Sequence, residues 1–277
     1  MTEFFKAVLF GIVEGITEWL PVSSTGHMIL LNEFVKMNVS PDFWELFLVV
    51  IQLGAILAVV LLFWDHMLPS GLFQKGKEGK RTRTKWLHLW CMIFIACVPA
   101  AVIGVLFDDV LDRVFYHWYV VAASLIVFGV AFLFVEKRNA DRRIRVKRLK
   151  ELRVSDAVVI GLFQLLAAIF PGTSRSGATI IGALLIGVAR SVAAEFTFLL
   201  AVPVMLGASL LKIVKFGFVF TMQEALLLLC GMAVAFAVSL LVIRFLLRFI
   251  RSHTFVSFGI YRIVLGVLVI AYFVFFR

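Results

Sequence analysis

Two carboxylates interrupt the first apolar stretch of the chain. Glu14 and Glu18 are four residues apart, so they share one face of a helix. Two carboxylates in apolar surroundings are costly, and they repel each other unless a cation or a shared proton lies between them. Oxygen ligands of this kind suit a hard divalent ion, and we expect Glu14 and Glu18 to bind Mg²⁺ or Ca²⁺. The alternative is a helix near the surface with both groups solvated.

A run of hydroxyl groups with one imidazole follows directly, formed by Ser23, Ser24, Thr25 and His27. A hydroxyl beside an imidazole can provide a nucleophile and a general base or acid. For Ser23 and Thr25 the alternative is capping of the next helix, which we expect to begin near Met28.

A second glycine- and hydroxyl-rich segment lies at residues 171–179 and contains Arg175. A turn that leads into a helix presents free N–H groups and the positive end of the helix dipole. The planar guanidinium of Arg175 suits phosphate. The segment therefore predicts an anion site, most plausibly for phosphate. The alternative is a structural ion pair between Arg175 and Glu14 or Glu18.

The composition indicates which elements position these residues. Hydrophobic residues make up 62% of the 277 positions and charged residues 16%, whereas soluble domains carry about 25% charged residues. A membrane-crossing helix needs about 20 apolar residues. The sequence predicts an all-α polytopic membrane protein with six spans, at residues 45–64, 86–107, 118–136, 195–215, 224–248 and 256–276.

Two further apolar regions, 4–37 and 156–189, are broken by Pro21 and Pro171. Proline ends a helix, and irregular backbone at membrane depth survives only where protein buries it or a wet cavity borders it. We expect two re-entrant helix–loop–helix hairpins, each of which enters and leaves on one side.

The net charge is +10, but the basic residues are clustered at 75–85, 137–153 and 244–251. Clustered cations beside apolar spans indicate the cytoplasmic side and favour anionic lipid, so we expect no nucleic-acid partner. With both hairpins re-entrant, all three clusters fall inside. Both termini, the first hairpin and the 108–117 loop (with Asp108, Asp109 and Asp112) then fall outside.

The two halves of the chain resemble each other. An offset of 150 pairs Gly11 with Gly161, Pro21 with Pro171, Ser24 with Ser174 and Glu45 with Glu195. We expect one membrane domain over 1–277, with repeat 1 at 1–136, a basic linker at 137–155 and repeat 2 at 156–277. Three spans follow each hairpin, so the second half is inverted, and such folds place their site near the midplane.

Several other polar residues carry a weaker signal. We expect a structural hydrogen-bonding role for the repeat mates Glu45 and Glu195. Arg262 either extends to the interface or meets an anionic group. The three cysteines lie in apolar runs and predict neither a disulfide framework nor a metal site. The first apolar segment lacks the features of a signal peptide, so we expect it to remain in the mature protein.

Together the two motifs identify a resemblance. Glu14-x-x-x-Glu18 followed by Pro21-Val22-Ser23-Ser24-Thr25-Gly26-His27, and the run from Pro171 to Thr179, resemble the two signatures of the undecaprenyl-diphosphate phosphatases. These are bacterial membrane phosphatases also known for bacitracin resistance. The resemblance covers nearly the whole chain.

The resemblance implies hydrolysis of undecaprenyl diphosphate, stimulated by divalent cations, at the external face of the cytoplasmic membrane. The product is the lipid carrier for cell-wall synthesis. Ser24 is then the preferred nucleophile, with His27 as general base or acid; His27 or a Glu-activated water are the alternatives. The residues expected to bind phosphate are Ser23, Thr25, Ser174, Arg175, Ser176, Gly177 and Thr179.

Two further expectations follow. The broken segments should meet at mid-membrane and bring Arg175 within contact range of Glu18 or Ser24. Inverted repeats are also the architecture of secondary transporters, so a transporter or flippase for a lipid phosphate or another anion is the alternative function. The sequence leaves a homodimer open as a further partner.

Overall fold

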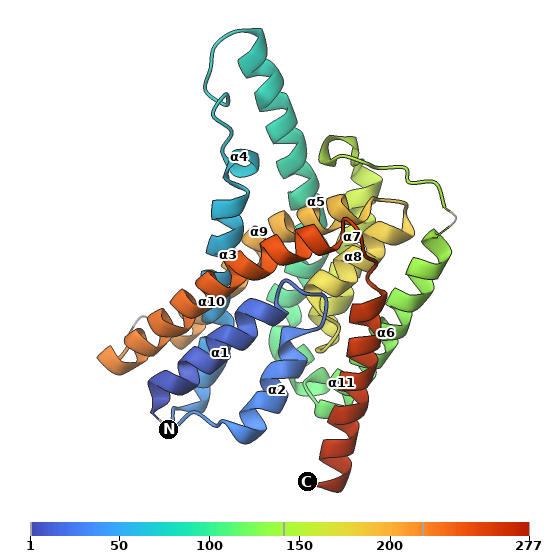
Figure 1. The fold of residues 1–277 in the computed structure, drawn as a ribbon. Helices are drawn as coiled ribbons and strands as arrows, with labels where there is room; N and C mark the ends of the chain where they lie inside the picture. The colour runs from blue at the N-terminus through green and yellow to red at the C-terminus, as the bar shows by residue number, and fades with distance from the viewer. Residues whose placement is uncertain (1, 141, 218, 277) are drawn as a thin grey trace.

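The computed structural model describes residues 2–140, 142–217 and 219–276, apart from the side chains of residues 108, 109 and 112. The described residues contain helices and no β-strand. The helices are α1 (Glu3–Thr17), α2 (Ser24–Phe34), α3 (Pro41–Leu62), α4 (Trp64–Met67), α5 (Lys77–Phe115), α6 (Trp118–Asn139), α7 (Val154–Ile169), α8 (Arg175–Leu185), α9 (Arg190–Phe216), α10 (Met222–Phe249) and α11 (Val256–Phe275), with a short 3₁₀ helix η1 (Leu149–Glu151) (Figure 1).

Six of these helices are long and apolar enough to cross a membrane: α3, α5, α6, α9, α10 and α11. Each covers one of the six predicted spans, so the hydropathy pattern located the spans correctly. The helix ends agree within a few residues, except in α5.

Helix α5 is the main departure from the prediction. It contains 39 residues and extends well beyond the apolar run in both directions. Lys77–Lys85, predicted as loop, is helical throughout, and its Lys, Arg and Glu residues are good helix formers. The predicted 108–117 loop is helical up to Phe115; the side chains of its three aspartates lie outside the described residues.

Two shorter helix pairs contain the broken segments. Helices α1 and α2 are separated by residues 18–23, and α7 and α8 by residues 170–174. Each pair is thus helix–loop–helix, as the prolines predicted. Helix α2 begins at Ser24 rather than near Met28, because Ser23 already accepts the capping hydrogen bond from the Gly26 N–H. Thr25 and His27 therefore lie in the first turn of a helix.

The helix pairs pack against the longer helices through close backbone contacts. Helix α1 lies along α10, and a Cβ atom at Gly11 would lie 2.7 Å from the Gly231 carbonyl oxygen. Helix α7 lies along α5, and a Cβ atom at Gly161 would lie 2.7 Å from the Ala96 carbonyl oxygen. Helices α6 and α11 run side by side (Figure 1). These contacts bring the two loops to the centre of the molecule.

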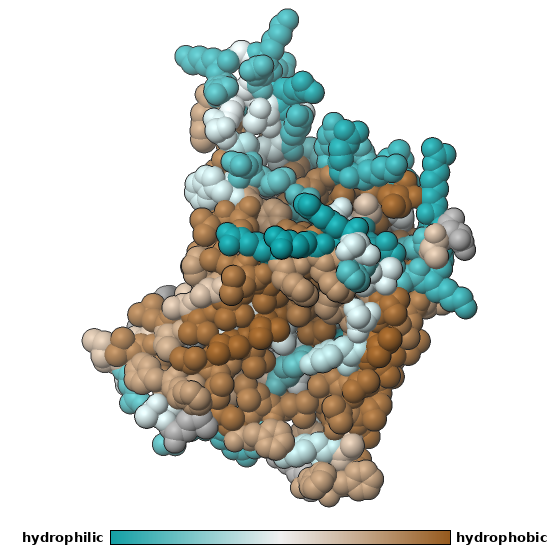
Figure 2. Space-filling model, in the orientation of Figure 1, coloured by the Kyte–Doolittle hydropathy of each residue, from teal (hydrophilic) through white to brown (hydrophobic). Residues whose placement is uncertain are grey.

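The surface divides into a hydrophilic end and an apolar body (Figure 2). The start of α5 projects from the hydrophilic end, whereas the chain termini lie at the opposite end (Figure 1). At roughly 1.5 Å per residue, α5 is about 58 Å long and exceeds the ~30 Å hydrocarbon thickness of a bilayer. Its charged first turns therefore extend beyond the apolar body.

Ion pairs join helices outside the loops. Arg190 binds both carboxylate oxygens of the buried Glu136, and the same carboxylate accepts the Phe255 N–H. Glu45 pairs with Lys212 at 3.4 Å, and Glu195 pairs with His66 at 3.1 Å. Glu45 and Glu195 thus each form an ion pair between two helices, consistent with the structural role expected for them.

Candidate active site

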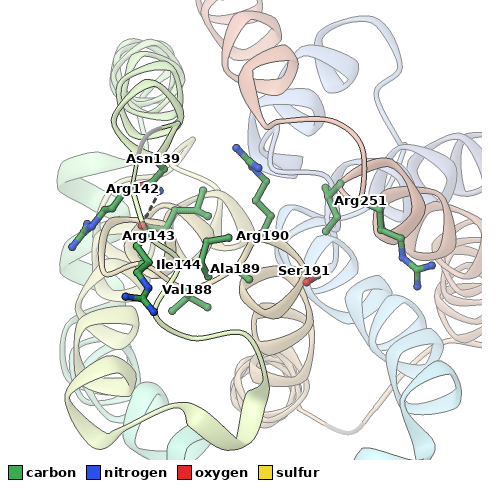
Figure 3. Close-up of a pocket in the computed structure, with 12 residues that line it drawn as sticks. Asn139, Arg142, Arg143, Ile144, Val188, Ala189, Arg190, Ser191 and Arg251 are labelled. Carbon is green, nitrogen blue, oxygen red and sulfur yellow. Dashed lines mark hydrogen bonds between the residues drawn. The ribbon is translucent and has the colours of Figure 1, made fainter.

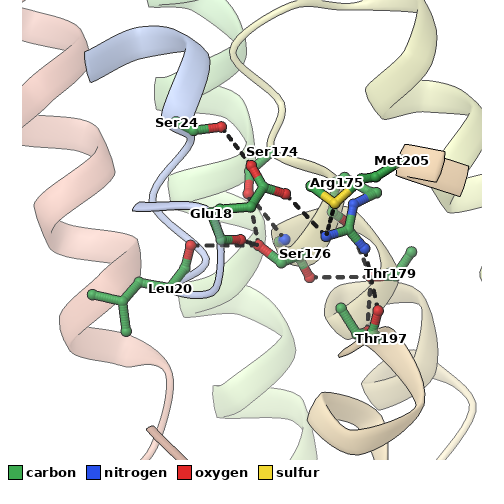
Figure 4. Close-up of polar contacts among 10 residues, drawn as sticks. Glu18, Leu20, Ser24, Ser174, Arg175, Ser176, Thr179, Thr197 and Met205 are labelled. Atoms are coloured by element: carbon green, nitrogen blue, oxygen red, sulfur yellow. Dashed lines mark hydrogen bonds and ion pairs between the residues drawn. The ribbon is translucent and has the colours of Figure 1, made fainter. Parts of the chain in front are cut away.

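The two loops lie against each other. The Ser176 hydroxyl donates to the Glu18 main-chain oxygen at 3.0 Å and approaches the Leu20 main-chain oxygen at 3.4 Å. These contacts join residues more than 150 positions apart in the sequence (Figure 4). The first turn of α8 is therefore fixed directly to the end of α1.

Both loops end in the same unusual turn. Ser23 and Ser174 have φ values of 75° and 68°, which residues other than glycine rarely adopt. Each hydroxyl caps the next helix by accepting from a backbone N–H three residues later, that of Gly26 or Gly177. Such strain is held only where the surroundings enforce it, often at functional sites. The counterpart of Ser174 is therefore Ser23, whereas the offset of 150 had paired Ser174 with Ser24. Two residues separate Pro171 from Ser174, but only one separates Pro21 from Ser23.

The Glu18 carboxylate is the centre of the site. Its Oε1 accepts from Arg175 Nη2 at 2.9 Å, and its Oε2 accepts from the Ser24 hydroxyl at 2.7 Å (Figure 4). The predicted contact between Arg175 and the first segment is confirmed. Glu18 and Arg175 are largely buried, whereas Ser24 is half-buried.

Arg175 also contacts helix α9. Its Nη1 donates to the Thr197 main-chain oxygen at 3.2 Å, and its Nη2 lies 4.0 Å from the Met205 sulfur. The Thr179 hydroxyl bonds the Thr197 hydroxyl at 2.8 Å and the Arg175 main-chain oxygen at 2.9 Å. A guanidinium fixed in this way presents a preorganised charge to an anion.

The hydroxyl groups predicted to bind phosphate separate into two classes. Ser23, Ser176 and Thr179 are buried, and their hydroxyl groups are used within the protein. The structure therefore does not present these three side chains to a ligand. Thr25 and Ser174 are half-buried, but the Ser174 hydroxyl also has partners within the protein, the Gly177 N–H and the Ser176 hydroxyl. The caps occupy the Gly26 and Gly177 N–H groups, and the remaining N–H groups of the first turns have no partner within their helices.

His27 lies in α2, one turn beyond Ser24, but the two residues do not bond each other. Its Nδ1 lies 2.7 Å from the Ser23 main-chain oxygen, and its Nε2 lies 2.8 Å from the Tyr261 hydroxyl. A carbonyl oxygen only accepts, so Nδ1 carries the proton and a neutral His27 accepts from Tyr261 through Nε2. Glu18, rather than His27, thus accepts the hydrogen bond of the Ser24 hydroxyl. Sequence reasoning missed Tyr261, because nothing local marks a tyrosine in an apolar span.

Glu14 lies beneath Glu18 and is 1% exposed. Its carboxylate interacts with Glu18 and Arg175, and its Oε1 has no hydrogen-bond partner among the described residues. Magnesium sites often use one or two carboxylates together with substrate phosphates. Glu14 and Glu18 fit that pattern, although the described residues contain no group of three or more His, Cys, Asp or Glu side chains.

Two open cavities lie elsewhere, at the hydrophilic end. One of about 500 Å³ borders the His66–Glu195 pair. Another of about 320 Å³ is lined by Arg142, Arg143, Arg190 and Arg251 (Figure 3). Arg190 is already paired with Glu136, and the other three guanidinium groups point in different directions (Figure 3). Neither cavity is lined by residues of the two loops.

One protein-family model matches nearly the whole chain. The family model described as bacitracin resistance protein BacA matches residues 7–268. The chain belongs to this family. A relative named undecaprenyl-diphosphatase from Desulfitobacterium hafniense is 56% identical over 99% of this chain and 97% of its own length.

Two further BacA-family relatives show the same extent of likeness. An undecaprenyl-diphosphatase from Enterococcus faecalis is 56% identical over 97% of this chain and 96% of the relative. Undecaprenyl-diphosphatase 1 from Clostridium acetobutylicum is 53% identical over 98% of this chain and 97% of the relative. With six apolar helices, this member of the family is a multi-pass membrane protein.

Proposed function

We propose that the chain hydrolyses undecaprenyl diphosphate to undecaprenyl phosphate and inorganic phosphate. The observation that carries the proposal is the Glu18 carboxylate, which binds both a hydroxyl group and a guanidinium group where two loops meet. A hydroxyl bonded to a carboxylate is a candidate nucleophile, and a buried arginine beside it is a candidate phosphate ligand. The names of the relatives support the same substrate. They do not support the alternative of a transporter or flippase.

In the first step, Arg175 and the free N–H groups at the starts of α2 and α8 bind the diphosphate. The Ser24 oxygen attacks the terminal phosphorus, and its proton passes to Glu18, which lies 2.7 Å away. The bond between that phosphorus and the bridging oxygen breaks, and undecaprenyl phosphate leaves. The terminal phosphoryl group remains on Ser24. Positioning and charge neutralisation carry most of such a reaction.

In the second step, water attacks the phosphoserine, the bond between phosphorus and the Ser24 oxygen breaks, and inorganic phosphate leaves as Glu18 returns its proton to Ser24. His27 is suited to activate this water. Residues three apart share a helix face, so the imidazole lies close enough to the phosphoserine for one water molecule to bridge the two side chains. The Tyr261 hydroxyl donates to Nε2, so this hydroxyl would accept the water proton and pass its own proton to Nε2. The site is built from one chain, so the mechanism needs no second copy.

We also propose that Mg²⁺ or Ca²⁺ binds with the substrate at Glu14 and Glu18. The unpartnered Oε1 of Glu14 supports this, since a buried carboxylate oxygen without a donor suits a cation. When bound, the ion neutralises charge on the phosphates. The role of the chain is to hold the two carboxylates side by side.

Purified protein in detergent is expected to release phosphate from a polyprenyl diphosphate. EDTA should lower the rate at least about tenfold, and added Mg²⁺ or Ca²⁺ should restore it. Phosphate release measured with a colorimetric assay checks both statements. No release from the wild-type chain in the presence of either ion would contradict the proposed function. Full activity in EDTA would remove the cation from the mechanism and leave the hydrolysis intact.

The placement in the membrane is part of the proposal. The chain lies in the bacterial cytoplasmic membrane, α1–α2 and α7–α8 are re-entrant, and the two halves are inverted repeats. Three observations support this: the matched turns at Ser23 and Ser174, the matched glycine contacts of Gly11 and Gly161, and the location of the hydrophilic end opposite the termini. The first hairpin and both termini are then external, and the site opens to that side.

Single cysteines test this orientation in a background that lacks the three native ones. Asn38→Cys, at an exposed position between α2 and α3, should react with a membrane-impermeant maleimide on intact cells. Lys80→Cys, at an exposed position in the projecting part of α5, should react only after permeabilisation. The reverse pattern would overturn the proposed orientation, and labelling of both on intact cells would contradict the assignment of opposite sides.

A further inference from the structure

Arg262 is fully buried in α11, away from any described carboxylate partner. Its side chain is 0% exposed, and among the described residues its hydrogen-bond acceptors are main-chain oxygens. A buried guanidinium without a counter-charge is costly in a membrane protein, and such residues usually have a function. The sequence predicted that Arg262 either extends to the interface or meets an anionic group; the side chain is instead buried, and its acceptors among the described residues are main-chain oxygens.

The acceptors of Arg262 come from both broken segments. Nη1 donates to the Pro21 oxygen at 3.3 Å, in the first loop. Nη2 donates to the Gly172 and Thr173 oxygens at 3.0 and 2.8 Å, in the second loop. A longer contact of 3.5 Å reaches the Ser124 oxygen of α6. One planar group thus connects the two loops to each other and to α6.

These acceptors stand next to the reacting groups in the chain. Pro21 lies midway between Glu18 and Ser24, and Thr173 directly precedes the Ser174–Arg175 pair. Loop carbonyl groups have no partner within a helix, and the five donors of a guanidinium can satisfy several at once. Any shift of Arg262 therefore changes the distance between Ser24 and Arg175.

Gly177 makes room for this side chain. A Cβ atom at Gly177 would lie 3.1 Å from Arg262 Nη1 and 3.3 Å from the Ser174 Cβ atom. Packing against Arg262 thus favours glycine at this position of the second motif, in the first turn of α8. The motif and Arg262 form one unit, although they lie in separate parts of the sequence.

We propose that Arg262 is a positioning residue for the phosphatase reaction: it sets the spacing of the two loops so that Ser24, Glu18 and Arg175 meet on one phosphate. It touches neither substrate nor reacting atoms. The inference rests on the proposed function. A misplacement of about 1 Å at a reacting centre can lower a rate about a hundredfold.

The test compares Arg262→Lys and Arg262→Met with the control Arg248→Met, an exposed arginine on α10. Wild-type phosphate release in the same assay verifies the proposed function separately. Arg262→Lys keeps the charge but loses the planar fork, so kcat should fall at least about tenfold while KM stays within about threefold. Arg262→Met should lower kcat about a hundredfold. The control should keep wild-type values.

A double-mutant cycle separates positioning from general stability. Ser176→Ala removes a hydrogen bond that joins α8 to the main chain of the first loop. Combined with Arg262→Lys, it should lower kcat at least about threefold more than the product of the single effects, because both ties hold one spacing. Multiplicative effects, a kcat for Arg262→Lys within threefold of wild type, or unfolding of that variant would each overturn the proposal, with wild-type activity intact.

Discussion

Replacing Arg175 with alanine is expected to lower kcat/KM by about a thousandfold or more. The arginine contributes a planar charge that is already oriented by Thr197 and Glu18, and arginines that stabilise phosphoryl transfer are worth about 10³–10⁵ in rate. Arg175→Lys should recover little of this loss, because an ammonium cannot replace the fork that bonds Glu18, Thr197 and a phosphate together. Phosphate release from a polyprenyl diphosphate measures both variants.

A control is needed because Arg175→Ala also leaves the buried Glu18 without its cation. Removing one member of a buried pair destabilises proteins by about 3–5 kcal/mol. Thermal unfolding of each variant in detergent reports this cost, and Arg175→Lys keeps the charge. Arg248→Ala, at an exposed position, should retain wild-type activity. A folded Arg175→Ala variant with kcat/KM within tenfold of wild type would remove Arg175 from the phosphate site.

Replacing Ser24 with alanine is expected to abolish phospho-enzyme formation and lower kcat by about a thousandfold or more. The hydroxyl is the attacking group, and its loss leaves only the binding and charge effects of the site. Ser209→Ala is the matched control: this buried serine donates to the Val49 main-chain oxygen and lies outside the site. It should keep kcat within about twofold of wild type.

Acid quenching with ³²P-labelled substrate, followed by peptide mapping, identifies the residue that carries the phosphate. Label on Ser24 is expected. Label on His27 would make the imidazole the nucleophile, and turnover without any label would favour direct attack by water. Glu18→Gln should reduce the amount of label in the first turnovers, because the amide cannot accept the Ser24 proton.

Much of this architecture follows from local sequence signals. Span positions follow from hydropathy, since about 20 apolar residues admit few alternatives to a membrane helix. The two breaks follow from Pro21, Pro171 and the polar residues beside them. The contact between Glu18 and Arg175 was predictable because buried charges need partners, and the two broken segments carried the available ones.

The errors have identifiable physical causes. Tyr261 and Arg262 lie more than 230 residues from their partners in the first segment, and no local pattern encodes such a contact. Pairing of Ser24 with His27 was expected from their spacing, but the helix begins earlier than expected and directs the imidazole to α11. The length of α5 was underestimated because hydropathy marks where a helix enters water, not where it ends.

The charged groups around Glu18 also determine the net charge of the substrate-free site. Glu14 and Glu18 lie side by side, and Arg175 is the cation that pairs with Glu18. A proton shared between the two carboxyl groups makes the substrate-free site neutral overall, which lowers the cost of keeping it inside an apolar body. A diphosphate makes it anionic on arrival. The excess negative charge is present only with bound diphosphate. A cation should therefore bind far more tightly to the substrate-bound site than to the substrate-free site.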